Sequence, residues 1–258
     1  MSEPTTTQLL QIAEATVREA MALALDPGIS LDVRTKTNRN DLVTAVDRRI
    51  EEVVAARLAE ATGYPMLGEE GHTVDSFAGR VWVLDPIDGT MNYVSTHRDY
   101  AVSLALCEDG APVVGVVADV VGSHVYTAVR GEGARCDGEA LAPVLDADDY
   151  TDAIIITDIK EILALPRLAR ALVDSRGHRR YGSAALECVE VAASRAGAFV
   201  HMWVSPWDIA ASSQMSEAGA RVTRLDGTPM DVRHKGSILV GAPRVHASLL
   251  KRLMTDAQ

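Results

Sequence analysis

The chain has 258 residues, of which 47% are apolar, and a formal net charge of −11 at pH 7. A chain of this length and composition can bury a large core, which excludes a disordered protein. The negative charge argues against broad binding to nucleic acid or anionic lipid, since both need a basic surface. No stretch approaches the roughly 18 apolar residues of a membrane span, and residues 1–7 lack the features of a secretory signal. We therefore expect a soluble, cytoplasmic protein.

Three cysteines, Cys107, Cys136 and Cys188, are odd in number and far apart in the sequence. They form no CxxC motif and no cysteine–histidine spacing that is typical of zinc or redox sites. We therefore expect them to be ordinary buried or half-exposed thiols.

Helical periodicity dominates the first part of the chain. Apolar residues recur at helical spacing over residues 7–25 and again over 47–61, where a glycine follows the end. The polar stretch 34–40 predicts a loop between these two helices. Short strand-like runs follow at 81–84, 101–106, 113–121 and 124–129, with turns between them. These runs predict a mainly antiparallel sheet.

Strands and helices alternate after about residue 146, which predicts an α/β arrangement. The predicted strands are 153–157, 199–204 and segments near 221–224 and 237–240. The predicted helices are 160–174, 184–196, 208–218 and 245–254. No flexible linker or internal repeat interrupts the chain. We therefore expect two halves, 1–145 and 146–258, that share one interface.

Two aspartates follow an apolar strand in the segment Val-Trp-Val-Leu-Asp-Pro-Ile-Asp-Gly-Thr at 81–90. Because Pro86 cannot continue a central ladder, we expect the strand to stop at Asp85. The following Asp-Gly-Thr predicts a tight entry into a helix, with Asp85 and Asp88 on one side of the turn beside free backbone N–H groups. This arrangement suits divalent cations and phosphate together. The alternative is an Asp-Pro turn with Asp88 as an ordinary helix cap.

Further acidic residues lie elsewhere in the chain. Glu69 and Glu70 end a short apolar element, and Asp208 opens a predicted helix. Taken alone, the glutamates could belong to a solvated loop and Asp208 could be a helix cap. Each signal is weak by itself, but acids that gather around Asp85 would form a cation site.

Several short motifs follow one another along the chain in a characteristic order. They are Asp-Leu-Val-Thr-Ala-Val-Asp at 41–47, Gly-Glu-Glu at 68–70, Asp-Pro-Ile-Asp-Gly-Thr-Met-Asn-Tyr at 85–93, Gly-Glu-Gly-Ala at 131–134 with Asp-Gly at 137–138, Gly-Ser-Ala-Ala at 182–185 and Trp-Asp-Ile-Ala at 207–210. In order and spacing these motifs resemble those of the inositol monophosphatase family, over nearly the whole chain. The resemblance implies a layered αβαβα sandwich of the sugar phosphatase type, with an antiparallel sheet in the first half (α+β) and a mixed sheet in the second (α/β).

The resemblance also implies a site for two or three Mg²⁺ ions. Hard oxygen ligands suit magnesium. Two carboxylates about 4 Å apart repel each other by roughly 4 kcal/mol at an effective dielectric constant near 20, and bound cations relieve that repulsion. The implied ligands are the carboxylates of Glu69, Asp85, Asp88 and Asp208, the backbone carbonyl of Ile87 and the hydroxyl of Thr90.

In the mechanism that the resemblance implies, a metal-activated water attacks the phosphorus in line. Glu69 and a pair formed by Thr90 and Asp47 would assist that water. Lys36 would help to organise the waters around the metals, although as a lone lysine it could equally lie on the surface.

The same resemblance assigns roles in holding the phosphate. Asp88 and Asp208 would hold a metal near the leaving oxygen, while backbone N–H groups at Gly89 and Thr90 hold the phosphate itself. Asp41 and Thr44 would brace the nearby loop, and Asp41 could equally cap a helix.

The part of the substrate beyond the phosphate would contact Gly182, Ser183 and Ala184, although Ser183 also fits a plain helix N-cap. His201 stands where many inositol-specific members carry a glutamate that accepts sugar hydroxyls. A neutral imidazole can accept one hydrogen bond, whereas a protonated one favours a second anionic group. Alternatively, His201 fills a polar strand edge.

The expected function is the hydrolysis of a small phosphate monoester, with inositol 1-phosphate or a related sugar phosphate as the substrate. Fructose 1,6-bisphosphate, NADP, histidinol phosphate and 3′-phosphoadenosine 5′-phosphate are alternatives, because the metal motifs do not distinguish them. Arg179 and Arg180 could meet a second anion or could serve only solubility. A second alternative is a regulatory protein that acts by binding a partner. The resemblance also implies a homodimer and sensitivity to lithium.

Overall fold

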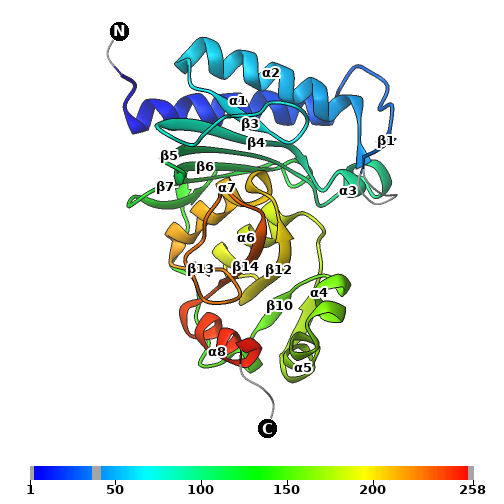
Figure 1. Cartoon of the computed structure of the whole chain (residues 1–258), viewed down its shortest axis with the longest axis vertical. Helices are drawn as coiled ribbons and strands as arrows, with labels where there is room; N and C mark the ends of the chain where they lie inside the picture. Colours follow the sequence, from blue (N-terminus) through cyan, green and yellow to red (C-terminus); the bar gives the residue numbers. More distant parts are fainter. Residues whose placement is uncertain (1–2, 37–41, 255–258) are drawn as a thin grey trace.

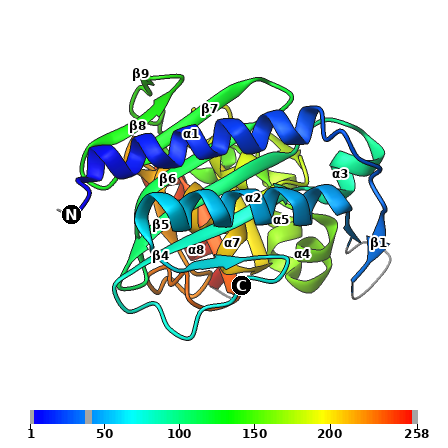
Figure 2. The same ribbon diagram turned by 90° about the horizontal axis from the view of Figure 1, so that it is seen from above.

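Two β-sheets and their helices stack in five layers in the computed structural model, which describes residues 3–36 and 42–254 (Figures 1 and 2). This is the αβαβα sandwich that the sequence predicts. In order, the layers are helices α1 (Thr6–Leu25) and α2 (Ala45–Thr62), a seven-stranded sheet, helices α6 (Ala184–Ala192) and α7 (Pro206–Gln214), a five-stranded sheet, and helices α4 (Ile159–Ala164), α5 (Pro166–Asp174) and α8 (Pro243–Met254).

Each helix of the first layer begins after a threonine that serves as its N-cap. Thr5 and Gln8 form a capping box at α1, and Thr44 and Asp47 form one at α2. Helix α2 ends at Gly63, whose φ of 69° is the left-handed conformation that favours glycine. Both predicted helices are confirmed. Their apolar stripes pack on the outer face of the large sheet and bury it from solvent.

The large sheet is an antiparallel meander with one parallel strand at its edge. Its order is β3-β4-β5-β6-β7-β8-β9, and only the pair β3 and β4 is parallel. The predicted antiparallel character is therefore confirmed. The strands are β3 (Met66–Gly68), β4 (Arg80–Asp88), β5 (Ala101–Glu108), β6 (Ala111–Asp119), β7 (His124–Val129), β8 (Gly133–Cys136) and β9 (Glu139–Ala140).

The small sheet is mixed, as predicted. Its order is β11-β10-β12-β14-β13, where β10 runs parallel to β11 and β12 while β14 runs antiparallel to β12 and β13. A short 3₁₀ turn at Tyr150–Asp152 precedes it. The strands are β10 (Ile154–Ile156), β11 (Gly177–Arg179), β12 (Ala198–Val204), β13 (Arg221–Thr223) and β14 (Gly236–Gly241).

Three predicted segments differ from the structure. The single helix expected at 160–174 is two helices, α4 and α5, because the residue before Pro166 is disfavoured in a helix and Pro166 opens a new one. The helix expected at 208–218 begins at Pro206 and its last turn is 3₁₀. The start of the loop expected at 34–40 is instead strand β1 (Arg34–Thr35), which pairs with β2 (Leu42–Val43). The rest of that loop from 37 on, with Asp41, lies outside the described residues.

The central core lies between the two sheets, around α6 and α7. Val83 of the large sheet, Phe199 of the small sheet and Ile209 of α7 meet there. A Cβ atom on Gly115 of β6 would lie 2.5 Å from the carbonyl oxygen of Ala211, so glycine lets α7 pack directly on the sheet. None of the helices in the described residues is long and apolar enough to cross a membrane.

Candidate functional site

A bulge in strand β4 places Asp85 and Asp88 on the same side of the sheet. Asp85 pairs with Ser103 of β5 and Asp88 pairs with Ala101, so three steps along β4 match two along β5. In a regular strand, side chains three positions apart point to opposite faces, and the extra residue removes that difference.

The same bulge corrects the prediction that the strand stops at Asp85. Strand β3 pairs with β4 only as far as Leu84. Beyond that point no β3 residue pairs with Pro86, so the missing N–H of proline breaks no hydrogen bond to β3. The ladder with β5 then resumes at Asp88. Proline is tolerated at bulges and at sheet edges, and Pro86 lies both in the bulge and beyond the end of β3.

Parallel pairing of β3 with β4 brings a third acid to the same edge. Gly68 lies opposite Leu84, so the next residues, Glu69 and Asp85, emerge from neighbouring strands at the same end. The sheet topology therefore brings together two acids that are far apart in the sequence.

Glu51 of α2 holds the loop that carries Glu69 through hydrogen bonds to the loop backbone. The buried Glu51 carboxylate accepts hydrogen bonds from the backbone N–H groups of Glu70 (2.7 Å) and His72 (3.0 Å). A Cβ atom on Gly68 would lie 2.4 Å from a Glu51 carboxylate oxygen. Glycine at position 68 therefore makes room for this carboxylate.

Lys36 reaches this loop from the segment before α2. Its Nζ atom contacts the carboxylate oxygens of Glu69 at 2.7 Å and of Glu70 at 2.5 Å. Burial lowers the pKa of Lys36, but the charges and hydrogen bonds of the two glutamates outweigh it, so the pKa lies above its ordinary value. Burial raises the pKa of Glu70 to about 7, against the opposing effect of Lys36.

Asp47 connects the start of α2 to the entry of α3 (Thr90–Ser95). It accepts a 2.9 Å hydrogen bond from the backbone N–H of Thr44 and a 3.3 Å bond from the Thr90 hydroxyl. The Thr90 hydroxyl also lies 3.1 Å from the carbonyl oxygen of Ile87. Burial raises the pKa of Asp47. Thr44 thus braces the carboxylate that orients Thr90.

Asp88 is bound to the start of α6 in the second half of the chain. Its Oδ2 atom accepts hydrogen bonds of 2.6 Å from the Ser183 hydroxyl and of 2.6 Å from the backbone N–H of Ala185. Burial raises the pKa of Asp88 to about 6, although these donors lower it. Ser183 is also the N-cap of α6. Its hydroxyl therefore holds Asp88 and caps the helix at the same time.

Asp208 comes from the first turn of α7, where its Oδ2 atom accepts a 2.6 Å hydrogen bond from the backbone N–H of Ser205. Burial, followed by the charge of Asp88, raises the pKa of Asp208 well above its usual range. Burial also raises the pKa of Asp85, and Glu69, Asp88 and Asp208 add to the shift. The acids thus disfavour one another's charge.

These side chains meet in one cavity of about 210 Å³. The acids of β4, of the Glu69 loop and of α7 all line it, together with the glycines on either side of the Asp88 contact. Its lining consists of Leu42, Glu69, Asp85, Ile87, Asp88, Gly89, Thr90, Met91, Arg180, Gly182 and Asp208. We call it the carboxylate pocket.

The carboxylate pocket fits divalent cations. It offers carboxylate, carbonyl and hydroxyl oxygens, which are the ligands that hard cations prefer. The Oδ1 atom of Asp85 is buried and has no hydrogen-bond partner, although buried polar atoms are normally paired. A cation at this point would satisfy that oxygen and offset the repulsion among the acids.

A second cavity of about 200 Å³ adjoins the first and shares Asp88, Arg180, Gly182 and Asp208 with it. We call it the distal pocket. Ala184 lines it, as do further polar residues, whereas the Ser183 side chain faces Asp88 instead. The rest of its lining is Asp158, Lys160, Glu187, His201 and Val204.

His201 has both ring nitrogens in contact with the protein. Its Nδ1 atom accepts a 3.1 Å hydrogen bond from the backbone N–H of Trp203, so the proton of the neutral ring is on Nε2. Nε2 lies 3.4 Å from the carboxylate of Glu161, which is fully buried. Burial lowers the pKa of His201. Burial therefore favours the uncharged imidazole, against the opposing charges of Glu161 and Asp158.

The two arginines near this pocket differ. Arg180 lines both cavities and pairs with Asp158 at 2.5 Å. Arg179 belongs to neither lining, and its guanidinium hydrogen-bonds the carbonyl of His178. Of the two, Arg180 is the one that a ligand could reach.

Three positioning residues escaped the sequence analysis. Glu51 carries the Glu69 loop, and its spacing of four from Asp47 on one helix face was a usable signal. Glu187 accepts hydrogen bonds from the backbone N–H groups of Tyr181 (2.8 Å) and Gly182 (2.9 Å). Asn92 donates to the carbonyl of Tyr181 at 2.7 Å. Nothing in the local sequence marks the contacts of Glu187 and Asn92, and only that of Asn92 joins distant segments.

Comparison with known proteins extends this picture. The model of the inositol monophosphatase family matches residues 3–258. The inositol-1-monophosphatase of Bacillus subtilis is 37% identical over 257 residues, which cover 96% of this chain and 97% of that protein.

Solved structures agree. The crystal structure of inositol monophosphatase-II from Staphylococcus aureus is 30% identical, covers 96% of each chain and has a TM-score of 0.86. A structure of an IMPase/NADP phosphatase complexed with Mg²⁺ and phosphate is 27% identical, covers 97% of each chain and has a TM-score of 0.89. This chain therefore belongs to the inositol monophosphatase family and is a hydrolase of phosphate monoesters.

Proposed function

We propose that this chain is a Mg²⁺-dependent phosphatase that acts on inositol 1-phosphate or a related sugar phosphate. The observation that carries the proposal is the buried, unpartnered Oδ1 atom of Asp85 in a pocket shared with Glu69, Asp88 and Asp208. A pocket of mutually repelling acids has little use without cations, and cations attract phosphate.

The proposed ligands of two or three Mg²⁺ ions are oxygen atoms only. When bound, the ions supply positive charge that neutralises the phosphoryl oxygens and lowers the pKa of water. The related IMPase/NADP phosphatase structure contains Mg²⁺ and phosphate, which supports this choice of metal. The ligands would be Glu69, Asp85, Asp88, Asp208, the carbonyl of Ile87 and the hydroxyl of Thr90.

The catalytic roles proposed for Thr90, Asp47 and Glu69 follow from the direction of their hydrogen bonds and proton transfers. Thr90 can donate its hydroxyl proton to Asp47 at 3.3 Å, which leaves the oxygen lone pairs of Thr90 free to orient a water molecule. Glu69 lines the same pocket and would accept the proton of that water. Lys36 would keep Glu69 in place through its 2.7 Å contact.

The proposed phosphate site lies at the entry of α3. Gly89 has a φ of 92°, and a Cβ atom there would lie 3.1 Å from the carbonyl oxygen of Gly182. This glycine lets the backbone turn closely enough for the N–H groups of Gly89 and Thr90 to hold phosphate oxygens. Asp88 and Asp208 would then face the leaving oxygen.

The proposed substrate extends from this point into the distal pocket, along Gly182 and Ala184. A solved structure of SaIMPase-II contains inositol monophosphate, which supports a sugar phosphate. Lys160 and Arg180 also line the distal pocket, so a substrate with a second anionic group is the main alternative. Fructose 1,6-bisphosphate, NADP and 3′-phosphoadenosine 5′-phosphate have such a group.

Phosphate release from a panel of substrates tests the proposal. The panel holds inositol 1-phosphate, fructose 1,6-bisphosphate, NADP, histidinol phosphate and 3′-phosphoadenosine 5′-phosphate, each with Mg²⁺ and with EDTA. We expect the highest kcat/KM for inositol 1-phosphate and no turnover in EDTA. Full activity in EDTA would contradict the metal site, and a higher kcat/KM for a bisphosphate would reassign the substrate.

The homodimer, the sensitivity to lithium, the cytoplasmic location and a separate partner-binding role stay predictions. Asp85→Asn separates the last of these from catalysis, because partner binding should survive the loss of the metals. Proteins captured from cells with this variant and with the wild type should then be the same.

A further inference from the structure

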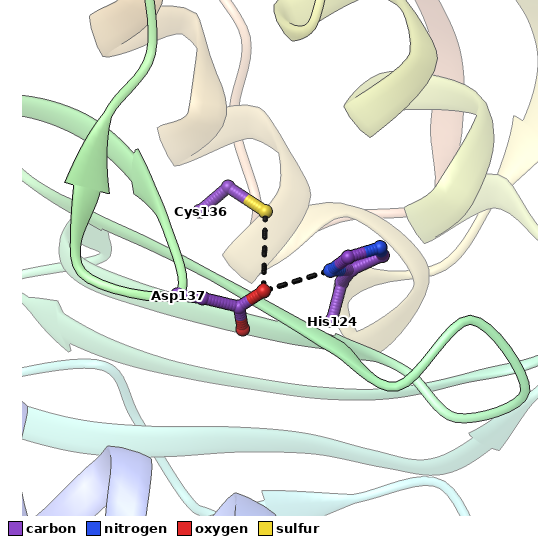
Figure 3. A group of neighbouring side chains, drawn as sticks. All are labelled: His124, Cys136 and Asp137. Atoms are coloured by element: carbon purple, nitrogen blue, oxygen red, sulfur yellow. Dashed lines mark hydrogen bonds and ion pairs between the residues drawn. The ribbon is translucent and has the colours of Figure 1, made fainter.

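Three potential metal ligands of different chemistry lie together where strands β7, β8 and β9 meet at the edge of the large sheet. They are His124, Cys136 and Asp137, and each offers an atom within 4.8 Å of the other two (Figure 3). None of them lines the carboxylate pocket or the distal pocket. This group is therefore a feature separate from the proposed active site.

The strand register brings the three side chains together. Cys136 of β8 pairs with Tyr126 of β7, and His124 is two positions before Tyr126 on the same strand. Because strand side chains alternate, His124 and Cys136 face the same side. Asp137 follows in the turn to β9 with a φ of 50°, and its carboxylate turns back towards both.

The carboxylate of Asp137 lies at the centre of the group. Its Oδ2 atom lies 2.7 Å from Nδ1 of His124 and 3.8 Å from Sγ of Cys136, and Figure 3 shows both contacts. Its Oδ1 atom accepts a 2.9 Å hydrogen bond from the backbone N–H of Val125, which fixes the side chain. The hydrogen bond from His124 lowers the pKa of Asp137, so the carboxylate is charged at neutral pH.

We propose that His124, Cys136 and Asp137 bind a Zn²⁺ ion, with water as the fourth ligand. Imidazole, thiolate and carboxylate are the protein ligands that zinc accepts, and a thiolate excludes the hard Mg²⁺ of the proposed active site. The side chains of His124 and Asp137 are 52% and 42% exposed, so an ion and a water can reach them.

The geometry needs only small changes. Ligand atoms of a tetrahedral zinc site are about 3.3 to 3.8 Å apart, given zinc distances of about 2.0 to 2.3 Å. The present Nδ1 to Oδ2 distance of 2.7 Å must widen, whereas the 3.8 Å between Sγ and Oδ2 already fits. On binding, Nδ1 of His124 gives up its proton, so that the neutral ring carries its proton on Nε2, and the Cys136 thiol loses its proton to solvent. The nitrogen and the thiolate sulfur each donate an electron pair to the ion. No oxidant or reductant is needed.

Titration with Co²⁺, a coloured substitute for Zn²⁺, tests this site in the full chain with the proposed active site saturated by Mg²⁺. A cobalt–thiolate bond gives a charge-transfer absorption band that oxygen ligands cannot give. We expect one equivalent of Co²⁺ to produce the band and one equivalent of Zn²⁺ to abolish it. No band in the wild type would overturn the proposal.

Four variants make the test specific. Cys136→Ser should remove the band, whereas Cys188→Ser, a matched change at a buried cysteine elsewhere, should keep it. His124→Gln and Asp137→Asn should each weaken Co²⁺ binding at least tenfold, which is the lower range for losing a supporting partner of a metal site. If the affinity of either is unchanged, the ion binds to a lone thiol and the proposal is wrong. Phosphatase activity with Mg²⁺ should be unaffected in Cys136→Ser.

Discussion

The carboxylate pocket and the distal pocket, which adjoin each other as two ends of one site, differ in how their charges are balanced. At the carboxylate pocket, Asp85, Asp88 and Asp208 are buried close to one another, and one oxygen of Asp85 has no partner. At the distal pocket, Arg180 pairs with Asp158, and His201 contacts Glu161. The buried aspartates of the carboxylate pocket repel one another, whereas Asp158 of the distal pocket already has a counter-charge in Arg180.

This difference separates what a ligand must supply from what the protein supplies itself. A cation at the carboxylate pocket would gain from several acids at once, so the proposed metals should contribute strongly there. A substrate group at the distal pocket must compete with contacts that already exist. Changes at the first end should therefore have large effects, and changes at the second end small ones.

The largest effect is expected for Asp85→Asn. Removing the charge of the unpartnered carboxylate should lower kcat/KM on the order of 10³-fold, the upper range for losing one electrostatic contact to a transition state. Phosphate release at saturating Mg²⁺ measures it. Glu139→Gln, the same kind of change at an exposed acid of β9, is the control and should leave the rate unchanged. A loss below tenfold for Asp85→Asn would contradict the contrast between the two ends.

Gly68→Ala should have the next largest effect. The added Cβ would meet the buried Glu51 carboxylate at 2.4 Å and displace the loop that carries Glu69. We expect kcat/KM to fall roughly 10- to 100-fold, because small misplacements of catalytic groups are costly. Gly71→Ala in the same loop meets no atom within 4 Å and is the matched control. Equal activities of the two variants would show that Glu51 does not position Glu69.

The stability of the metal-free protein should depend on pH through Asp88. Burial raises the pKa of Asp88 to about 6 in the folded state, so the folded protein binds this proton more tightly than the unfolded chain. Stability from this group therefore rises as the pH falls, by about 1 kcal/mol between pH 7 and pH 5. The buried His246, whose pKa burial lowers to about 4, has the opposite effect.

The measurement must therefore compare two proteins. Urea unfolding in EDTA at pH 7 and pH 5 gives the change in unfolding free energy for the wild type and for Asp88→Asn. The wild type should gain about 1 kcal/mol relative to the variant at the lower pH. Parallel pH profiles of the two proteins would sink this prediction.

The smallest effect is expected for His201→Gln at the distal pocket. Both nitrogens of His201 already contact the protein, and burial lowers its pKa. Both observations disfavour a charged ring that binds a second anionic group of the substrate. We expect the ratio of kcat/KM for inositol 1-phosphate and for fructose 1,6-bisphosphate to change less than tenfold. A larger change, with loss of an ionisation near neutral pH, would show that a charged His201 selects the substrate.

The fold was largely predictable, because most elements depend on local patterns. The stripes of α1 and α2 and the apolar runs of the strands are visible in the residues themselves. The continuation of β4 through Pro86 was not, because it depends on where β3 ends in space. The break between α4 and α5 was visible as Pro166 and was simply missed. Strands β8 and β9 are too short to give a pattern.

The acids of the site could be named from the sequence because family motifs mark Glu69, Asp85, Asp88 and Asp208. Two of their supports could not. Asn92 acts through the backbone carbonyl of Tyr181, which lies in a distant segment. Glu187 binds backbone N–H groups of the turn just before its own helix, and no residue type in that turn marks the contact. The hydrogen-bonding role of His201 was not predictable either, since the Trp203 N–H that contacts its Nδ1 atom is a feature of the folded strand.

Asp88 also joins the large sheet to helix α6 of the next layer. One of its carboxylate oxygens is held by Ser183 and Ala185 at the start of α6, while its strand belongs to the large sheet. Moving this carboxylate away from Ser183 and Ala185 would remove the hydrogen bonds that join the large sheet to α6. Release of the proposed cations and separation of the two sheets should therefore be thermodynamically linked, so that the metal-free protein should open first where Asp88 meets α6.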